Sequence, residues 1–304
     1  MATVLERLPS GARVAAIRLR SLGDCVLTTP ALALLKQCRP DLAVAVVVEE
    51  RFRAIFEGNP DISRILRPSA KEMFAWRPSL VLNLHGGTRS MMLTAASSAG
   101  IRAGFGHHRF RFLYSHRIPR AQEILGEERK VHTAEHITSA MFWLGIPRAE
   151  PPRAKLFADD GPDMPNGAYA VLHPFASEPA KTWPADRFVA VASEFKRAGL
   201  EPIFLAGPGD DSSPFAAFEA WNGAPLNRVK NLLARAQLFV GNDSGPAHIA
   251  AAFGVPVVAL FGPSDPCIWG PWRTPASVLK SPRGIAGIGI DQVLEAAIGL
   301  RVQA

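Results

Sequence analysis

Residues 240–254, VGNDSGPAHIAAAFG, combine residue types that could bind a diphosphate at the start of a helix. Asp243 and Ser244 both favour the position just before a helix. The first N–H groups of a helix have no partner within it, and the helix dipole attracts negative charge. We therefore expect a diphosphate to contact the N–H groups of Ser244 and Gly245, the Ser244 hydroxyl and the His248 ring. A well-capped turn that binds no ligand fits the same local pattern equally well.

Asp24 is the candidate for acid–base chemistry. It follows a predicted strand at residues 14–19 and stands at the start of a predicted helix at residues 24–37. An aspartate in this position usually caps the helix. The functional alternative is a carboxylate that faces the ligand and takes a proton from an attacking hydroxyl. The neighbouring Cys25 is expected to be a packed thiol.

Residues 173–184, HPFASEPAKTWP, form a third candidate loop. Lys181 lies just before a helix predicted to begin near Pro184, where a cation is unfavourable for the helix. An anionic ligand would remove this conflict, so Lys181 is predicted to bind phosphate. Ser177 lies in the same loop. Trp183 is expected to pack in the core. The two-glycine loop at residues 83–90 fits a structural turn better than an anion nest.

These loops need a scaffold of strands and helices, and the sequence predicts one in each half of the chain. Strands are expected at residues 14–19, 43–48, 79–84, 169–172, 202–206, 236–240 and 255–261, and helices at 24–37, 185–198, 227–235 and 291–300. This alternation predicts two α/β domains with parallel sheets. A proline-rich stretch places the boundary between residues 1–158 and 159–304, and the last helix could pack back on the first domain. Ligands bind at the carboxyl ends of such strands, so a cleft between the domains is expected.

Composition limits the classes of protein. The chain has 304 residues, of which 48% are hydrophobic, and no run approaches the ~20 apolar residues of a membrane span. Its start does not fit a signal peptide, and its three cysteines lack metal-ligand spacing and fit a reducing compartment. Residues 1–155 hold 23 Lys and Arg against 13 Asp and Glu, whereas residues 156–304 hold 11 against 14. This asymmetry predicts an anionic partner for the first half, either nucleic acid or an acceptor at a membrane surface.

Taken in order, these segments resemble the heptosyltransferases of glycosyltransferase family 9, which build the inner core of lipopolysaccharide. The resemblance covers nearly the whole chain. It is carried by residues 17–24 (IRLRSLGD), 28–32 (TTPAL), 173–184, 241–248 (GNDSGPAH) and 261–266 (FGPSDP), with weaker matches at 102–106 and 132–136.

The resemblance implies a GT-B fold of two Rossmann-like domains, with parallel sheets that face an interdomain cleft. It implies metal-independent, inverting transfer from ADP-heptose, or a related ADP-sugar, to an anionic Kdo–lipid A acceptor, with no cofactor and no nucleic acid. Asp24 matches the family's general base. The donor-binding residues would be Lys181, Asp243, Ser244, Gly245, His248, Ser177 and Gly207. Between Gly207 and Asn227, however, no residue can be matched to the adenine.

The acceptor is expected to contact basic residues of the first half, which would be Arg89, Arg102, Arg109 and Arg111. The enzyme would act in the cytoplasm, peripherally at the inner face of the cytoplasmic membrane. Two alternatives stay open. A sugar-nucleotide epimerase of the same architecture would need acid–base groups on both faces of the sugar, and only Asp24 is well placed. A non-catalytic polyanion-binding protein would not need Asp24 and Lys181.

Overall fold

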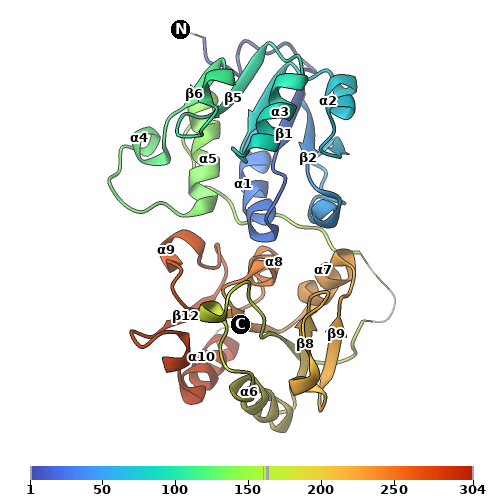
Figure 1. Ribbon diagram of the computed structural model, residues 1–304, viewed down its shortest axis with the longest axis vertical. Helices are drawn as coiled ribbons and strands as arrows, with labels where there is room; N and C mark the ends of the chain where they lie inside the picture. Colours follow the sequence, from blue (N-terminus) through green and yellow to red (C-terminus); the bar gives the residue numbers. More distant parts are fainter. Residues whose placement is uncertain (1, 160, 162–163, 303–304) are drawn as a thin grey trace. The chain divides into compact units, whose positions relative to one another are not determined.

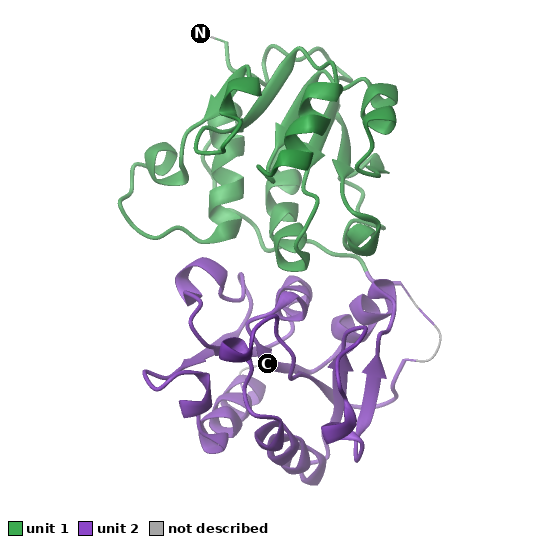
Figure 2. Ribbon diagram, in the orientation of Figure 1, with its two compact units in different colours: residues 1–157 green, residues 158–304 purple. Residues whose placement is uncertain are grey.

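The computed structural model describes residues 2–159, 161 and 164–302. The chain forms two compact units that divide between Phe157 and Ala158 (Figure 2). The roles of the two halves as an acceptor-binding domain, residues 1–158, and a donor-binding domain, residues 159–304, stay predictions.

Unit 1 is built on a six-stranded parallel sheet in the order β3-β2-β1-β4-β5-β6 (Figure 1). Its strands are β1 (Arg13–Ile17), β2 (Ala43–Val47), β3 (Arg64–Leu66), β4 (Leu80–Asn83), β5 (Ile101–Phe105) and β6 (His116–Ile118). Its helices are α1 (Leu22–Cys38), α2 (Ala70–Trp76), α3 (Thr88–Ala96), α4 (Ala121–Leu125) and α5 (Thr133–Leu144), with short 3-10 helices η1 (Glu50–Ile55) and η2 (Arg111–Leu113). Helices α1 and α5 pack together on one face, and α2 and α3 on the other.

Unit 2 repeats this architecture with a parallel sheet in the order β12-β11-β10-β7-β8-β9. Its strands are β7 (Tyr169–His173), β8 (Glu201–Ala206), β9 (Glu219–Asn222), β10 (Leu238–Asn242), β11 (Val257–Phe261) and β12 (Ala276–Lys280). Its helices are α6 (Ala185–Arg197), α7 (Leu226–Arg235), α8 (Gly245–Phe253), α9 (Pro266–Trp269) and α10 (Ile290–Val302), with η3 (Pro179–Lys181), η4 (Ser213–Phe215) and η5 (Ile285–Gly287). Within this unit α10 packs on α6 and on β10–β12; its predicted return to the first domain stays a prediction.

The central strands are apolar without alternation because helices cover both faces of each sheet. β2 has the sequence AVAVV, and its last four residues are buried. In unit 1, Met73 of α2 and Leu93 of α3 pack on Ala15 and Ile17 of β1. In unit 2, fully buried Trp183 packs with α6 and α10, as expected of a core residue.

Read from one edge, each sheet has the Rossmann strand order, with the first and fourth strands of its unit side by side. The α/β prediction with two Rossmann-like domains is therefore confirmed. In such sheets the chain leaves neighbouring central strands toward opposite faces, which opens a crevice at their carboxyl ends. These crevices lie between β1 and β4 in unit 1 and between β7 and β10 in unit 2.

Several predicted boundaries were wrong by a few residues. The first strand ends at Ile17 rather than residue 19, and its helix begins at Leu22 rather than at Asp24. The predicted strand at residues 236–240 is β10, shifted two residues along the chain. The predicted start at residue 255 was early because Val255 and Pro256 belong to the turn after α8, and β11 begins at Val257.

Candidate functional site

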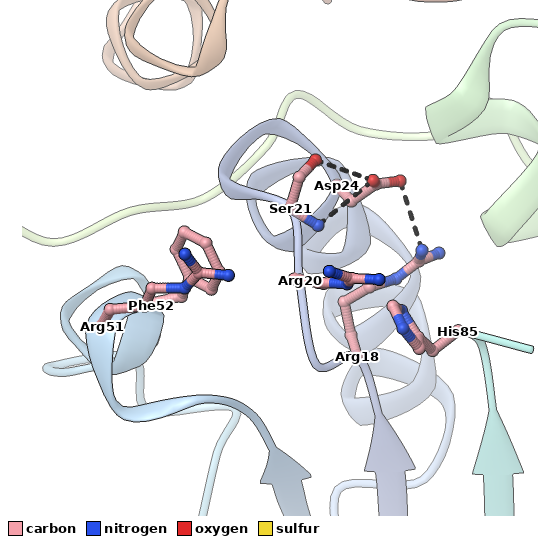
Figure 3. Close-up of a pocket in the computed structure, with 7 residues that line it drawn as sticks. All are labelled: Arg18, Arg20, Ser21, Asp24, Arg51, Phe52 and His85. Atoms are coloured by element: carbon pink, nitrogen blue, oxygen red, sulfur yellow. Dashed lines mark hydrogen bonds and ion pairs between the residues drawn. The ribbon is translucent and has the colours of Figure 1, made fainter. Parts of the chain in front are cut away.

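Asp24 lies at the crevice of unit 1, in the third position of α1 (Figure 3). Ser21 is the residue that caps this helix, so the expected capping position of Asp24 was wrong. The Asp24 Oδ2 accepts hydrogen bonds from the Ser21 backbone N–H at 3.3 Å and from the Ser21 hydroxyl at 2.9 Å. A carboxylate in this position returns to the cap and satisfies one of the free N–H groups of the helix start.

The other Asp24 oxygen, Oδ1, accepts a hydrogen bond from Nη1 of Arg18 at 3.2 Å. The Arg18 side chain is 9% exposed, whereas that of Asp24 is 21% exposed. Burial lowers the pKa of Arg18, and the Asp24 carboxylate raises it again. An ionised carboxylate accepts about four hydrogen bonds. With the three bonds found among the described residues, Oδ1 can accept one more, from a ligand hydroxyl.

Asp24 lines a pocket of about 480 Å³ at the carboxyl ends of β1, β2 and β4 (Figure 3). The lining residues are Arg18, Arg20, Ser21, Asp24, Arg51, Phe52 and His85. Three guanidinium groups and one carboxylate line this pocket, which favours an anionic ligand that also carries hydroxyl groups. Four of these residues were not predicted as site residues from the sequence: Arg18, Arg20, Arg51 and His85. The signal for Arg20, Arg51 and His85 was their place in the loops after predicted strands, where ligands of α/β sheets bind. Arg18 gave no such signal, because it fell inside the strand predicted at residues 14–19, whereas β1 ends at Ile17.

Histidines form a cluster beside this pocket. His108 Nδ1 lies 3.0 Å from the Tyr114 hydroxyl, and the His136 ring stacks on Phe105 at 4.2 Å. His107 lies between them, with its ring 4.8 Å from that of His108 and 5.7 Å from that of His136. Burial, with nearby histidines and Arg18, lowers the pKa of both His108 and His136 to about 4. The rings are therefore neutral at pH 7.

Two glycines make room for this cluster. A Cβ on Gly86 would lie 2.4 Å from the His108 ring, and one on Gly104 would lie 2.2 Å from the Tyr114 ring. The buried Asn83 side chain accepts hydrogen bonds from the N–H groups of His85 and Gly86, at 3.1 and 3.0 Å. These N–H groups are thus used within the turn, which supports the structural interpretation of this loop over an anion nest.

The four arginines predicted to bind the acceptor are dispersed. Arg89, at the start of α3, is 59% exposed and lies 3.6 Å from Glu49. Arg109 and Arg111 are exposed in the loop after β5. Arg102 is the second residue of β5, in register with Val81 and Ala15. It therefore lies partway along the strands and not at their carboxyl ends, where the crevice opens. The fold therefore brings Arg18, Arg20 and Arg51 to Asp24, and it does not bring Arg102 there.

The crevice of unit 2 contains the predicted phosphate-binding residues. Ser244 caps α8 by its extended backbone, as expected, but its side chain makes no capping bond. Its Oγ is buried without a hydrogen-bond partner in the described part of the chain. The Lys181 ammonium lies 3.9 Å from Asp243 Oδ2, so two of the predicted residues meet. His248 is buried one turn further along α8.

Buried polar contacts hold this crevice in shape. The Asn242 side chain accepts the N–H of Trp183 at 3.1 Å and donates to the Pro174 carbonyl at 2.8 Å. It therefore joins the loop after β7 to the end of β10. A Cβ on Gly262 would lie 2.2 Å from the Ala180 carbonyl oxygen, so only glycine lets the Lys181 segment approach the end of β11.

The remaining predicted donor residues, Ser177 and Gly207, follow the neighbouring strands β7 and β8. Ser177 is exposed in the loop after β7. Gly207 follows β8, and its N–H donates to the Asp210 carboxylate at 2.7 Å. Beneath them, buried His173 contacts the Leu205 carbonyl at 2.8 Å through Nδ1, and burial lowers its pKa. Among the described residues of this crevice, the structure does not single out a residue that would bind the adenine.

Among the described residues, no group of three or more His, Cys, Asp or Glu side chains is arranged to hold a metal ion. None of their helices has the length and apolar character needed to span a bilayer. Cys25 is fully buried, and burial raises the pKa of its thiol, as expected of a packed side chain.

Comparisons with known proteins find relatives over most of the chain. The family model for glycosyltransferase family 9 (heptosyltransferase) matches residues 71–286, which span parts of both units. Lipopolysaccharide heptosyltransferase 3 of Escherichia coli is 27% identical over 291 residues, which cover 84% of each protein.

Solved structures share the fold. The crystal structure of the glycosyl transferase family 9 from Veillonella parvula DSM 2008 gives a TM-score of 0.85 at 24% identity, covering 96% of this chain and 98% of that one. E. coli heptosyltransferase WaaC with ADP-2-deoxy-2-fluoro heptose gives 0.74 at 20% identity, covering 96% of this chain and all (100%) of the other. The expected GT-B fold class is thereby confirmed.

Proposed function

This chain belongs to glycosyltransferase family 9, and on that premise we propose that it transfers a heptose from ADP-heptose to the inner core of lipopolysaccharide, with inversion at the anomeric carbon. The observation that carries the proposal is the place of Asp24. Its carboxylate stands at the crevice between β1 and β4, in a pocket with three arginines, with one acceptor position left on Oδ1. The E. coli relative is named a lipopolysaccharide heptosyltransferase, which fits this chemistry.

Asp24 acts as the general base. It takes the proton of the attacking acceptor hydroxyl while the oxygen of that hydroxyl bonds to the anomeric carbon. The bond from this carbon to the diphosphate breaks in the same step, and ADP leaves with the electron pair. Arg18 fixes the orientation of Asp24 through the contact between Nη1 and Oδ1.

Unit 2 stabilises the leaving diphosphate. The free N–H groups at the start of α8, the Ser244 hydroxyl and the Lys181 ammonium supply hydrogen bonds and positive charge where negative charge develops. Asp243 holds Lys181 at 3.9 Å, a distance from which the ammonium can move to phosphate. This arrangement supports a reaction that needs no divalent cation.

The acceptor is the anionic partner of unit 1. Arg20 and Arg51 line the pocket beside Asp24, and a guanidinium binds carboxylate or phosphate in a bidentate manner. We assign the Kdo carboxylates or a core phosphate to this pocket. Arg89, Arg109 and Arg111 are proposed to contact more distant parts of the same acceptor. Because the acceptor is a lipid, the enzyme is proposed to work peripherally at the cytoplasmic face of the inner membrane.

Purified protein with ADP-heptose and a Kdo–lipid A acceptor tests the proposal. Mass spectrometry should show one heptose added per acceptor, with one ADP released. Asp41→Asn is the matched control for Asp24→Asn, because Asp41 also pairs with an arginine, Arg39, at 2.7 Å. Incubation with the donor alone distinguishes the epimerase alternative, which would yield an epimer without acceptor. Acceptor binding without any transfer would favour the polyanion-binding alternative.

A further inference from the structure

Three large hydrophobic side chains of unit 1 are exposed on neighbouring elements. Phe74 of α2 is 58% exposed, Met92 of α3 is 68% exposed and Phe112 of η2 is 69% exposed. Helix α2 contacts α3, and α3 contacts η2, so the three elements form one continuous surface, which we call the α2–α3–η2 surface. A single exposed apolar residue is ordinary, but large apolar side chains gathered on adjacent elements are typical of a binding surface.

The segment around η2 alternates arginine and phenylalanine over residues 109–112. The Arg109 guanidinium lies 5.5 Å from the centre of the Phe110 ring, and the Phe110 and Phe112 rings are 6.4 Å apart. Arg111 is exposed between them. Aromatic rings beside cations are typical of segments at the interface between lipid and water, where the ring enters the headgroup layer and the cation contacts phosphate.

The elements that carry the exposed hydrophobic residues are also rich in cations. The three elements of the α2–α3–η2 surface, with up to three flanking residues at their ends, carry six cations: Arg67, Lys71, Arg77, Arg89, Arg109 and Arg111. Glu72 is the one carboxylate in these segments, and it pairs with Arg67 at 3.1 Å. A surface that is apolar and strongly basic complements an anionic lipid headgroup layer.

The surface is continuous with the pocket that contains Asp24. Glu49 pairs with Arg89 of α3 at 3.6 Å and with Arg51 of the pocket at 3.0 Å. A lipid anchored beside α3 would therefore extend its headgroup sugars toward Arg51.

From these observations we infer that the α2–α3–η2 surface docks unit 1 on an anionic lipid bilayer, with Phe74, Met92 and Phe112 inserted among the headgroups. The inference rests on the proposed function, which puts the acceptor in a membrane. A protein partner is less well matched, because the cores of protein interfaces are depleted of charged residues, whereas six cations share these elements with the apolar side chains.

Flotation with lipid vesicles tests the inference on the full chain. Vesicles of phosphatidylethanolamine with phosphatidylglycerol should bind the wild type, those of phosphatidylcholine alone should bind it weakly, and salt should weaken the binding. The triple variant Phe74→Ser, Met92→Ser, Phe112→Ser should lower the partition coefficient by about tenfold or more, because the apolar contribution is lost. Ile298→Ser is the matched control, since Ile298 of α10 is 63% exposed outside this surface, and it should bind as the wild type does.

Transfer to a deacylated, water-soluble acceptor separates this inference from the proposed function. The triple variant should retain wild-type turnover in that assay while losing vesicle binding. Unchanged vesicle binding of the triple variant would overturn the inference, as would equal binding of the wild type to neutral and anionic vesicles. Concentration-dependent dimerisation that the triple variant abolishes, without vesicle binding, would make the surface a contact between copies. A wild type that binds vesicles through this surface but transfers no heptose would refute the proposed function alone.

Discussion

The Arg18 guanidinium donates to the Asp24 carboxylate at 3.2 Å, and the arginine is the more buried partner of this pair. The structure thus encloses the cation and leaves the carboxylate at the pocket surface. Such an arrangement fixes the direction of one Asp24 oxygen and leaves that oxygen able to contact a ligand.

Arg18 is a positioning residue for Asp24 in this account. Arg18→Met should lower kcat roughly 10–100-fold, since a small displacement of a reacting group costs about this much. The ADP dissociation constant should stay unchanged, and Arg18→Lys should recover part of the rate by restoring a donor. Steady-state kinetics with ADP titration measure both quantities. Equal losses of kcat in the Lys and Met variants would argue against a positioning role.

Lys181 should contribute to binding of the diphosphate. Lys181→Ala removes a charge-assisted contact, so it should weaken ADP binding by about tenfold or more. Calorimetric titration with ADP measures the effect. Lys196→Ala is the control, because Lys196 also pairs with a carboxylate, that of Glu201 at 3.7 Å, but lies at the far end of α6. Similar ADP affinity in both variants would contradict the phosphate site.

Replacing Ser244 by alanine should weaken ADP binding without lowering the stability of the unliganded protein. Its buried Oγ has no partner among the residues that the structure describes, so Ser244→Ala loses no internal hydrogen bond. An unsatisfied buried polar group costs about 1–3 kcal/mol. The variant should therefore keep or raise the Tm of the unliganded protein while weakening ADP binding. A clear drop in Tm with unchanged ADP affinity would show that the hydroxyl serves the fold instead.

The histidine cluster should make unit 1 less stable in acid. The pKa values of His108 and His136 fall to about 4 in the folded chain, against about 6.5 in the unfolded one. Between these values the unfolded state binds more protons than the folded state, so the free energy of unfolding rises with pH. The stability that the two neutral histidines contribute is lost as the pH falls from about 6.5 to 4. His136→Phe preserves the ring on Phe105 and should reduce this slope.

Urea denaturation at pH 7 and pH 5 measures the slope. His116→Phe is the control, because His116 lies on β6 outside the stacked cluster. The two variants should differ at pH 5 more than at pH 7. An identical pH dependence in the wild type and His136→Phe would mean that the cluster does not contribute.

Arg51 should contribute to acceptor binding. Arg51→Gln should raise the acceptor KM and leave the ADP-heptose KM nearly unchanged, because Arg51 lines the pocket of unit 1. Added salt should likewise raise the acceptor KM, since exposed charges are screened within about 8–10 Å at physiological ionic strength. Initial rates at low and high salt test this. If both changes raised the donor KM instead, the pocket would belong to the donor.

The sequence predicted most of what local chemistry determines. The N-cap role of Ser244 and the strand before it follow from residue types within a few positions, as does the burial of Trp183. The pocket of Asp24 did not follow, because Arg51 and His85 reach it only through the β2-β1-β4 strand order. Arg102 was predicted near the acceptor from charge alone, and the sheet register that sets its depth is a long-range property.

The position of Asp24 was also hard to predict at the level of single residues. Serine and aspartate both favour helix starts, and from the sequence only Asp24 was considered as a cap. The structure uses both, with Ser21 as the cap and Asp24 at the third position. The correction matters for mutagenesis, because Asp24→Asn leaves the cap in place but removes the charge that neutralises buried Arg18.

The turnover of folded Asp24→Asn at saturating ADP-heptose and acceptor tests the central claim most directly. The account predicts a fall of roughly 10²–10⁴-fold, the usual contribution of a general base, with ADP affinity unchanged and Asp41→Asn close to wild type. Removal of the partner of Arg18 should also lower the free energy of unfolding by about 1–3 kcal/mol, so the assay is run where circular dichroism shows the variant folded. Near-normal turnover of folded Asp24→Asn would contradict the account and leave Asp24 only its hydrogen bonds to Ser21 and Arg18.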